Sequence, residues 1–418
     1  MKRPKSLLST LPPEIWAITT VALLFRLAFY FHHQLQGWQL QHDPSLYLAL
    51  ADGSKHGVFS MFHPLDIPET TRMPGYPFLI HLLGDLRIVL LVQVLVSSLK
   101  VPLMYSLGKR IGLEGRSLLL PLLVIAIAPI DIILAGSLLT ESLFSVLLLT
   151  AICLLIGRNS IASCILAAFA IALAAYLRPN GLLIGIVIAV LLLADRRFRW
   201  RSVIFPGMLL ILLLPWMWRN LEVSGKYHLS DSGTVVAAHF HVPDVLIEAD
   251  DPAAATYRQR LHDLAASTNW ADKIEMRRYF DTLENDVRSV FLDHPVAWMK
   301  VMLSKTMKIL LAPGRGHIGR HFEDAIIERS IVLLSILTSA LVAIGILSFI
   351  AVIKKADRGH WSMIMVALTI IISGSISAPD ARFKDAAMPL LLLIAFWSFQ
   401  QLRSKYFTRG NAQGSRSV

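Results

Sequence analysis

Residues 118–156, LLLPLLVIAIAPIDIILAGSLLTESLFSVLLLTAICLLI, form an apolar stretch in which only Asp131 and Glu141 are charged. The stretch divides into two runs, Leu118–Ala135 and Leu138–Ile156, and each approaches the ~20 apolar residues that a helix needs to cross a bilayer. Asp131 comes late in the first run, and Glu141 falls in the first turn of the second. These residues therefore predict two consecutive membrane-spanning helices with acidic side chains close to where they meet.

The same pattern recurs along the whole chain of 418 residues, of which 55% are hydrophobic and 17% charged. Its mean hydropathy is +0.58, whereas soluble domains carry roughly 25% charged residues. The sequence thus predicts an all-α polytopic membrane protein with about ten transmembrane helices, and excludes a soluble enzyme with a single anchor. The further predicted spans are Ile15–Phe31, Leu86–Leu107, Ile161–Leu177, Leu182–Ala194, Val203–Trp218, Ser330–Ile353, Ser362–Ala378 and Ala386–Leu402.

The basic residues predict the orientation of these helices. Lys and Arg number 40 against 29 Asp and Glu, a net charge of +11. A cytoplasmic N-terminus places every short basic loop in the cytoplasm, as the positive-inside rule requires. The charge then needs no nucleic-acid partner, and we expect a multi-pass protein of the bacterial inner (plasma) membrane with both termini cytoplasmic. The clusters are Lys109/Arg110/Arg116, Arg158, Arg196/Arg197/Arg199/Arg201, Lys354/Lys355/Arg358 and Arg403/Lys405/Arg409.

This topology divides the chain into three parts. Residues 1–218 form an N-terminal transmembrane module whose first outer loop is 32–85. Residues 219–329 form a periplasmic and interfacial segment, and residues 330–418 form the C-terminal transmembrane helices and a cytoplasmic tail. All of the side chains suited to chemistry fall on the outer face, toward the periplasm or cell exterior.

The outer segment is expected to be mostly helical. Lys226–Val242 looks irregular or strand-like, and Pro252–Ala266 and Asp272–Asp293 look helical, the second ending at a His-Pro pair. Val296–Leu311 carries three lysines, at 300, 305 and 308, which makes a membrane span expensive. We expect an interfacial helix whose lysines point toward lipid headgroups.

The first outer loop holds a carboxylate and an arginine that each allow two interpretations. Asp43 precedes Pro44 and an apolar run, the pattern of a helix N-cap followed by proline at the first helical position. A carboxylate just outside a span could equally act as a general base toward an acceptor hydroxyl. Arg72, in Arg72-Met73-Pro74-Gly75-Tyr76-Pro77, could reach lipid headgroups or grip a phosphate through two parallel hydrogen bonds.

Other charged residues recur at the outer ends of the predicted spans. Glu141 is explained by the helix dipole alone, whereas Asp131, expected near a helix C-terminus, is not. Arginines follow at Arg178, Arg219 and Arg382. Carboxylates beside arginines at a lipid-accessible edge suit chemistry on a lipid-linked phosphate, because the cations stabilise the leaving phosphate and a carboxylate serves as base.

In this order and placement, the motifs resemble the GT-C superfamily of membrane glycosyltransferases. The likeness is greatest to the protein O-mannosyltransferase and lipid A aminoarabinose transferase type, and it covers most of the chain. The matching residues are Asp43 with Tyr47, the Arg72–Pro77 string against the family's R-x-P-x-Y-P, Thr140-Glu141-Ser142-Leu143-Phe144, Leu177-Arg178-Pro179, Pro215-Trp216 with Arg219-Asn220, and Ala381-Arg382-Phe383.

The resemblance implies transfer of a sugar from a polyprenyl-phosphate donor to an acceptor hydroxyl, normally with inversion. The acceptor could be a lipid, a glycan or a protein. Asp43 would be the catalytic base, with Asp131 and Glu141 orienting the sugar or acceptor or helping to bind a divalent metal, Mg²⁺ or Mn²⁺. Family members often carry an acidic pair where Asp43 is followed by Pro44, which argues against the protein-mannosylating branch. The remaining substrate-binding candidates are Tyr47, Arg72, Tyr76, Arg178, Arg219 and Arg382.

Two other hypotheses bear on function. His42, His239 and His241 could suggest a metal, but their spacing lacks an ordered third ligand and favours packed or solvated histidines. A flippase or transporter of a lipid-linked glycan would place ionisable groups near the bilayer midplane. Only Arg26 and Lys100 stand out within the spans, and both are expected to snorkel toward an end. This pattern favours surface chemistry over transport.

Overall fold

The computed structural model describes residues 11–38, 40, 43–61, 67–157, 159–194, 199–376 and 380–414, with side chains as far as residue 404. All regular structure in these ranges is helical, which confirms the predicted all-α class. The first ten residues lie outside the described residues, as do His42, Arg158, Arg196 and Arg197.

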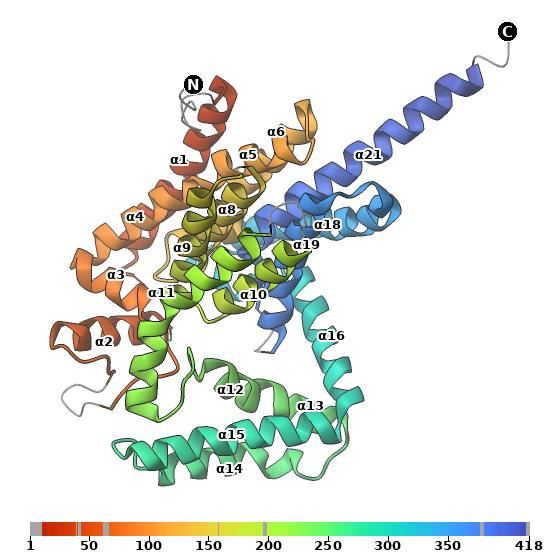
Figure 1. The fold of residues 1–418 in the computed structure, drawn as a ribbon. Coiled ribbons are helices and arrows are strands. Elements are labelled where there is room, and N and C mark those ends of the chain that lie inside the picture. The colour runs from red at the N-terminus through yellow and green to blue at the C-terminus, as the bar shows by residue number, and fades with distance from the viewer. Residues whose placement is uncertain are drawn as a thin grey trace.

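The N-terminal half contributes eleven helices to the part of the chain that the structure describes (Figure 1). They are α1 (Pro13–Leu35), α2 (Asp43–Lys55), α3 (Gly75–Leu83), α4 (Leu86–Ser98), α5 (Lys100–Arg110), α6 (Gly115–Ile127), α7 (Pro129–Ala135), α8 (Glu141–Gly157), α9 (Ile161–Leu177), α10 (Asn180–Leu193) and α11 (Arg201–Ser224).

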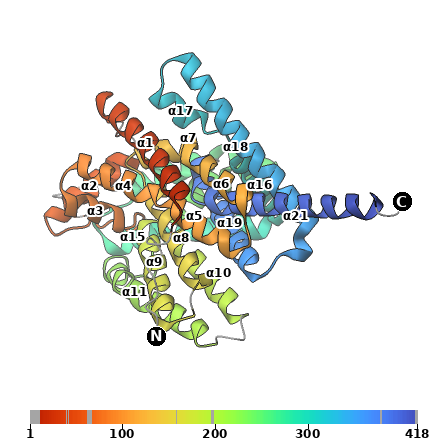
Figure 2. The same cartoon turned by 90° about the horizontal axis from the view of Figure 1, so that it is seen from above.

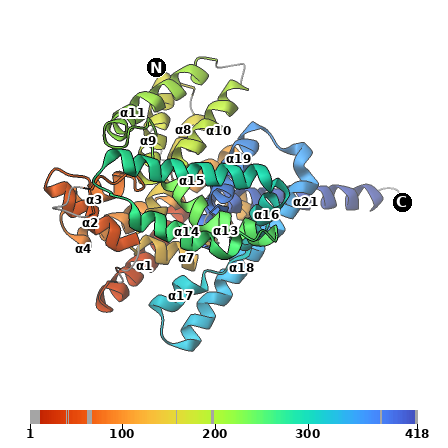
Figure 3. The ribbon, with the colours of Figure 1, turned by 90° about the horizontal axis from the view of Figure 1, so that it is seen from below.

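The outer segment and the C-terminal part complete the fold. The outer helices α13, α14 and α15 lie across the underside of the bundle in Figure 3, and α16 leads back from them. Viewed from above, α9, α10 and α11 gather on the side of the molecule opposite α17 and α18 (Figure 2). These elements are α12 (Ser232–Val236), the π-helix η3 (Ala237–His241), α13 (Val242–Glu248), α14 (Ala254–Ser267), α15 (Lys273–Asp293), α16 (Pro295–Leu311), α17 (Arg315–His321), α18 (Ala325–Val352), the 3-10 turn η4 (Ile353–Lys355), α19 (Arg358–Ser375), α20 (Arg382–Asp385) and α21 (Met388–Gly414).

Several helices have the length and composition of membrane spans. Within the described residues, four apolar helices are long enough to cross a bilayer: Pro13–Leu35, Leu86–Arg110, Arg201–Ser224 and Ala325–Lys355. Helices α6 and α7 together form a bent fifth candidate, and α8, α9 and α10 are shorter apolar helices. A membrane protein is therefore supported, and the count of about ten spans stays a prediction.

The expected single helix over Leu118–Ala135 is wrong. The chain breaks at Ala128, which is extended, and α6 and α7 meet at an angle of 53°. Pro129 explains the break, because a proline disfavours the helical conformation of the residue before it and fits the first turn of a new helix. Asp131 consequently sits in the first turn of α7 instead of at a helix C-terminus.

Two further expectations need correction. Lys226–Val242 is not strand-like throughout, since α12 and η3 cover Ser232–His241 and pack into the outer segment's own core with α14 and α15. Arg26 and Lys100 do not snorkel: both are fully buried and pair with Asp131, while Lys100 lies 3.8 Å from Asp385. Long-range pairing of this kind is invisible to local hydropathy.

One lysine of α16 also differs from expectation. Lys305 is buried, donates a hydrogen bond to the carbonyl oxygen of Phe240 at 2.7 Å and pairs with Asp244 at 2.8 Å. Lys300 pairs with Glu248 at 3.1 Å. Lys305 therefore faces α13 and η3 and does not point toward headgroups. Lys300 and Lys308 are exposed, so their orientation toward headgroups stays a prediction.

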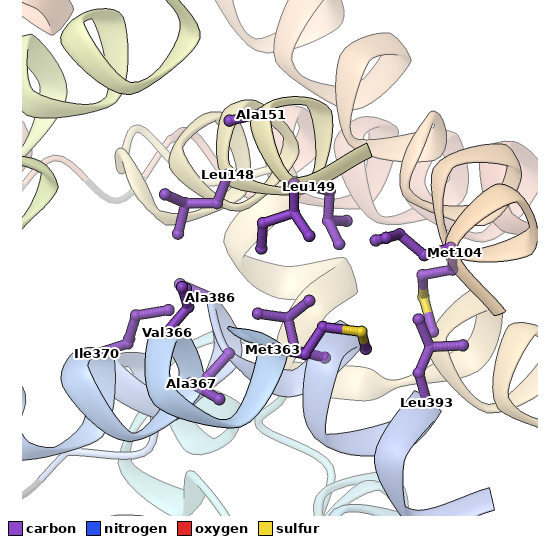
Figure 4. Close-up of a cluster of buried hydrophobic side chains, with 14 of the residues drawn as sticks. Met104, Leu148, Leu149, Ala151, Met363, Val366, Ala367, Ile370, Ala386 and Leu393 are labelled. Atoms are coloured by element: carbon purple, nitrogen blue, oxygen red, sulfur yellow. The ribbon is translucent and has the colours of Figure 1, made fainter. Parts of the chain in front are cut away.

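The main apolar core includes side chains from α8 and the C-terminal helices, together with others from α1, α5, α6, α9, α10 and α11. Figure 4 shows Leu148 and Leu149 of α8 pointing toward Met363 and Val366 of α19. Burial of such side chains brings α8, which begins at Glu141, against the helices on either side of α20. The apolar core thereby sets the separation of two polar turns that are distant in the sequence.

Candidate active site

A cavity of about 490 Å³ opens where α2, α8, α10, α12, α19 and α20 meet. Among the described residues its lining includes three arginines and three carboxylates, so its charge is balanced. The rest of the wall is largely apolar or neutral. These charged residues are Asp43, Arg72, Glu141, Arg178, Asp380 and Arg382.

Asp43, the first residue of α2, is held by two arginines. Its Oδ1 accepts a hydrogen bond from Arg72 at 3.0 Å, and its Oδ2 accepts one from Arg382 at 2.8 Å. Burial raises the pKa of Asp43, but the positive charges of Arg382 and Arg72 outweigh that effect and leave the pKa below its usual value. The carboxylate is therefore ionised and engaged on both oxygens.

Glu141 and Arg178 form a second ion pair in the cavity, with Nη1 of Arg178 2.6 Å from Oε1 of Glu141. Glu141 is 2% exposed, and its Oε2 has no hydrogen-bond partner among the described residues. The Arg178 guanidinium also lies 5.6 Å from the ring centroid of Phe383. A buried carboxylate oxygen without a donor costs free energy, so this edge of the cavity is suited to a hydroxyl or amine of a ligand.

Helix α20 holds Arg382 at the cavity through its neighbours in sequence. Lys384 donates hydrogen bonds to Ser339 Oγ at 2.6 Å and to the carbonyl oxygen of Leu310 at 3.1 Å. Asp380 precedes the helix, and its Oδ1 accepts the backbone N–H of Arg382 at 3.0 Å. These contacts anchor a very short element on both sides and leave the Arg382 guanidinium directed at Asp43.

Asp380 is held in its ionised form by its neighbours. Burial would raise its pKa, but the hydrogen bond from His317 and the charge of Arg382 lower the pKa to about 2. Burial also opposes the charged form of Arg382, yet Glu141, Asp43 and Asp380 together raise its pKa above the usual value. Both groups are therefore charged throughout the physiological range.

The outer segment closes one side of the cavity. Ser232, Gly233 and Val236 of α12 and Phe240 of the π-helix η3 contribute to its lining. Phe240 is 47% exposed although it is large and apolar. Because Lys305 binds the carbonyl oxygen of Phe240, α16 helps to fix this turn. The outer segment thus contributes directly to the cavity wall.

The structure brings together most, but not all, of the site residues predicted from sequence. Tyr47 lines the cavity, and Tyr76 is buried beneath it with ring centroids 5.1 Å apart. Arg219 does not line the cavity; it donates hydrogen bonds to the carbonyl oxygens of Glu69 at 2.6 Å and Phe59 at 3.3 Å. Asp131 is buried between Arg26 and Lys100. Substrate contacts by Tyr76, Arg219 and Asp131 therefore stay predictions.

Several lining residues were not predicted from the sequence as site residues, Asp380 and Asn180 among them. Asp380 stands two positions before Arg382, and Asn180 follows Arg178 by two and donates a hydrogen bond to Ser373 Oγ at 2.8 Å. Each lies two residues from a predicted arginine, so this proximity was the available signal. His317 gave no such signal, since its contact with Asp380 joins residues 63 positions apart.

The described residues do not fit a resident metal site well. No group of three or more His, Cys, Asp or Glu side chains in this part of the chain could hold a metal ion. Both oxygens of Asp43 bind arginines, and Asp380 binds His317. His241 is buried and packs on Trp298 with ring centroids 4.3 Å apart. His42 lies outside the described residues.

Comparison with known proteins identifies the fold. No family model and no curated protein sequence matches the chain. The archaeal oligosaccharyltransferase AglB from Archaeoglobus fulgidus, solved with an inhibitory peptide and a dolichol-phosphate, matches with a TM-score of 0.53 and 14% identity over 97% of this chain and 52% of AglB. An Archaeoglobus fulgidus oligosaccharyltransferase tethered with an acceptor peptide gives a TM-score of 0.53 and 12% identity over 94% of this chain and 50% of its own. ArnT from Cupriavidus metallidurans bound to undecaprenyl phosphate gives 0.42 and 13% over 93% and 77%.

The first two matches establish a shared fold. The chain spans about half the length of AglB, and the identity is too low for the likeness to carry more than the fold. This chain therefore shares the fold of these oligosaccharyltransferase structures over 94–97% of its length, in keeping with the helical architecture expected from the sequence.

Proposed function

We propose that this protein is a membrane glycosyltransferase that moves a sugar from a polyprenyl-phosphate donor to an acceptor hydroxyl on the outer face of the membrane, with inversion. The observation that carries the proposal is Asp43 between Arg72 and Arg382 in one cavity of a chain with the GT-C fold. A carboxylate with an arginine nitrogen within 3.0 Å of each of its oxygens supplies both a base and a phosphate site.

The arginines are proposed to bind the donor phosphate. Arg72 and Arg382 approach Asp43 from opposite ends of the sequence and are 30% and 24% exposed, so an incoming phosphate can reach both guanidinium groups. Guanidinium forks bind phosphate through two parallel hydrogen bonds. As the bond between the anomeric carbon and the phosphate oxygen breaks, these cations stabilise the negative charge that the leaving phosphate takes up.

Asp43 is proposed to accept the proton of the acceptor hydroxyl. The hydroxyl oxygen forms the new bond to the anomeric carbon, the phosphate leaves with the electron pair of the broken bond, and the proton goes to the Asp43 carboxylate. The arginines that lower the pKa of Asp43 make it a weak base before the donor binds. When they turn to the phosphate, its pKa rises. Donor binding therefore makes Asp43 a stronger base for the reaction.

The remainder of the cavity provides for the sugar and the acceptor. Oε2 of Glu141 is buried without a hydrogen-bond partner among the described residues and can accept a hydroxyl of either substrate. The wall formed by Val236 and Phe240 is apolar and belongs to the outer segment. We assign the choice of acceptor, whether lipid, glycan or protein, to this wall. The proposed location is the bacterial inner membrane with the cavity facing the periplasm.

A flippase of a lipid-linked glycan is the alternative. It would need ionisable groups along a path through the membrane. Arg26, Lys100, Asp131 and Asp385 are such groups, but each is at most 3% exposed by side chain, and none belongs to the cavity lining described above. They pair with one another, which favours a structural role over transport.

The test is release of free polyprenyl phosphate by purified protein in detergent, supplied with a panel of polyprenyl-phosphate sugars and membrane extract as acceptor. We expect release by the wild type and release slowed by about 100-fold or more in Asp43→Asn, and parallel reactions with EDTA report any need for a divalent metal. Inversion is read from the anomeric configuration of the product. No release from any donor would reject the transferase and make lipid translocation in vesicles the next experiment.

A further inference from the structure

Helix α17 reaches the site through one histidine that has no part in the mechanism above. His317 is buried, and its Nε2 lies 3.0 Å from Oδ1 and 3.0 Å from Oδ2 of Asp380. The contact joins the outer segment to the turn before the last helix. Because Nε2 faces both oxygens, it occupies the side of the carboxylate that would otherwise be open to another donor.

The backbone around α17 is built for close approach. Gly314 precedes the helix with φ +76°, a conformation that favours glycine. A Cβ at this position would lie 2.3 Å from Cδ1 of Ile130 and 3.3 Å from Cβ of Ala381. Ile318, one residue after the histidine, is fully buried in a cluster with Ile130 and Ile133 of α7. The ring of His317 is therefore placed by packing on α7 and next to α20.

Asp380 links His317 to Arg382. Its Oδ1 accepts the backbone N–H of Arg382 at 3.0 Å, while its Oδ2 remains 3.7 Å from Nε of Arg382. Nε of Arg382 is buried without a hydrogen bond among the described residues. A carboxylate this close to a guanidinium would ordinarily form a paired, two-bond contact with it. The histidine holds Asp380 short of that contact, and Nη1 of Arg382 remains available to Asp43 at 2.8 Å.

We infer that His317 is a positioning residue for Arg382: by binding Asp380, it keeps the guanidinium directed into the cavity for an anionic ligand. The inference deepens the proposed function and rests on it where the ligand is the donor phosphate. When the His317 side chain is removed, Asp380 moves closer to Arg382 and draws the guanidinium out of the cavity.

Chemical modification tests the positioning without any donor. Phenylglyoxal reacts with accessible guanidinium groups, and peptide mass spectrometry reports each arginine separately. Arg72 is the internal reference, since its exposure is comparable and it contacts Asp43 but not α20. In His317→Ala we expect the reactivity of Arg382 relative to Arg72 to fall at least threefold. His317→Gln, which retains an N–H donor, should keep the wild-type ratio.

The matched control is His321→Ala. His321 is also buried on α17, but its ring packs on Phe29 and His33. A threefold fall in this variant too would mean that any cavity in α17 disturbs Arg382, and would overturn the inference. An unchanged ratio in His317→Ala would overturn it as well.

Donor kinetics then separate this inference from the proposed function. With a donor that the wild type turns over, His317→Ala should raise the donor KM about tenfold with little change in kcat. In an Asp380→Ala background, His317→Ala should cause no further rise in the donor KM. If His317→Ala lowers the phenylglyoxal reactivity of Arg382 but the wild type turns over no donor, the positioning role is supported and the transferase is rejected. If the reactivity falls but the donor KM is unchanged, the assignment of this arginine to the donor is rejected.

Discussion

At the scale of single residues, the cavity pairs each of its cations with a carboxylate. Asp43 engages Arg72 and Arg382, and Glu141 engages Arg178. Such pairs contribute little where they are exposed, and breaking a buried pair leaves an uncompensated charge. In this cavity the pairs can exchange partners, since the anionic phosphate of an incoming donor can bind the arginines in place of the carboxylates and release the carboxylates for chemistry.

Asp43→Asn should reduce kcat by about 100-fold or more, the range attributed to general base catalysis. Donor binding should be retained or strengthened, because the substitution removes the anion that competes for Arg72 and Arg382. Release kinetics and donor titration measure the two effects. Asp52→Asn is the control on the same helix, since that side chain is 61% exposed and pairs only with the nearby Lys55 among the described residues. Equal losses in both variants would contradict the base assignment.

Arg382→Ala should raise the donor KM by about 30-fold, which corresponds to the ~2 kcal/mol of a charge-assisted hydrogen bond. Arg382→Lys should recover only part of this loss, because a lysine keeps the charge and lacks the planar fork. The dependence of polyprenyl phosphate release on donor concentration checks both. An unchanged KM in the alanine variant would make α20 purely structural.

The activity of the free enzyme should withstand mild acid. The pKa of Asp43 lies below its usual value and that of Asp380 is about 2, so both are ionised above pH 5 and lose their charge only as the pH falls through these lowered values. We expect kcat/KM for the donor to vary by less than threefold between pH 7 and 5 at constant ionic strength. A loss with a midpoint near pH 6 that disappears in Asp43→Asn would contradict this assignment.

At the scale of elements, the charged residues of the cavity lie at helix starts and in turns, and the long helices hold these starts in position. Asp43 begins α2, Glu141 begins α8, and Arg382 begins the four-residue α20. Helix starts are rigid and leave backbone N–H groups unpaired, so acidic residues there are favoured and anions are attracted. Because these helix starts pack closely against neighbouring elements, a small increase in side-chain volume there should displace them.

Gly75→Ala should disturb the site from the first turn of α3. A Cβ at residue 75 would lie 2.6 Å from the carbonyl oxygen of Tyr176 in α9, so the turn that carries Arg72 would have to move. We expect a lower melting temperature in detergent and a reduced kcat/KM. Gly207→Ala is the control, because nothing lies within 4 Å of its Cβ position inside α11 and alanine favours the helix. Similar melting temperatures for the two variants would contradict the packing argument.

At the scale of the whole molecule, two buried networks connect the helices around the cavity. Asp131 of α7 pairs with Arg26 of α1 and Lys100 of α5, and Lys100 approaches Asp385 of α20 at 3.8 Å. The main apolar core joins α8 to α19 and α21. The position of Arg382 therefore depends on residues from both ends of the chain.

Asp131→Asn should destabilise the protein by about 3–5 kcal/mol, because it leaves two buried cations with one remaining carboxylate. Thermal or denaturant unfolding in detergent measures this loss. The surface pair of Asp52 and Lys55 provides the contrast, and Asp52→Asn should change stability by less than about 1 kcal/mol. A loss of activity without a loss of stability in Asp131→Asn would instead support a direct role for Asp131 in the reaction.

The apolar pattern was sufficient to predict most of the elements. Hydropathy predicted the helical class, and the His-Pro pair at residues 294–295 correctly predicted the end of α15. The errors came from local signals that tertiary structure overrides. Pro129 splits the helix expected over 118–135, and packing against α14 and α15 makes helices of residues 232–241.

The sequence by itself determined that the chain is an apolar helical protein with arginines and carboxylates at helix ends, because hydropathy and turn chemistry are properties of neighbouring residues. Only the tertiary structure decided which of those charges meet. Asp43 and Arg382 are 339 positions apart, whereas Arg219, an equal candidate by sequence, binds the carbonyl oxygens of the first loop. The physical reason is that an ion pair depends on the distance between two side chains, and here that distance is set by the burial of apolar helices far from either residue.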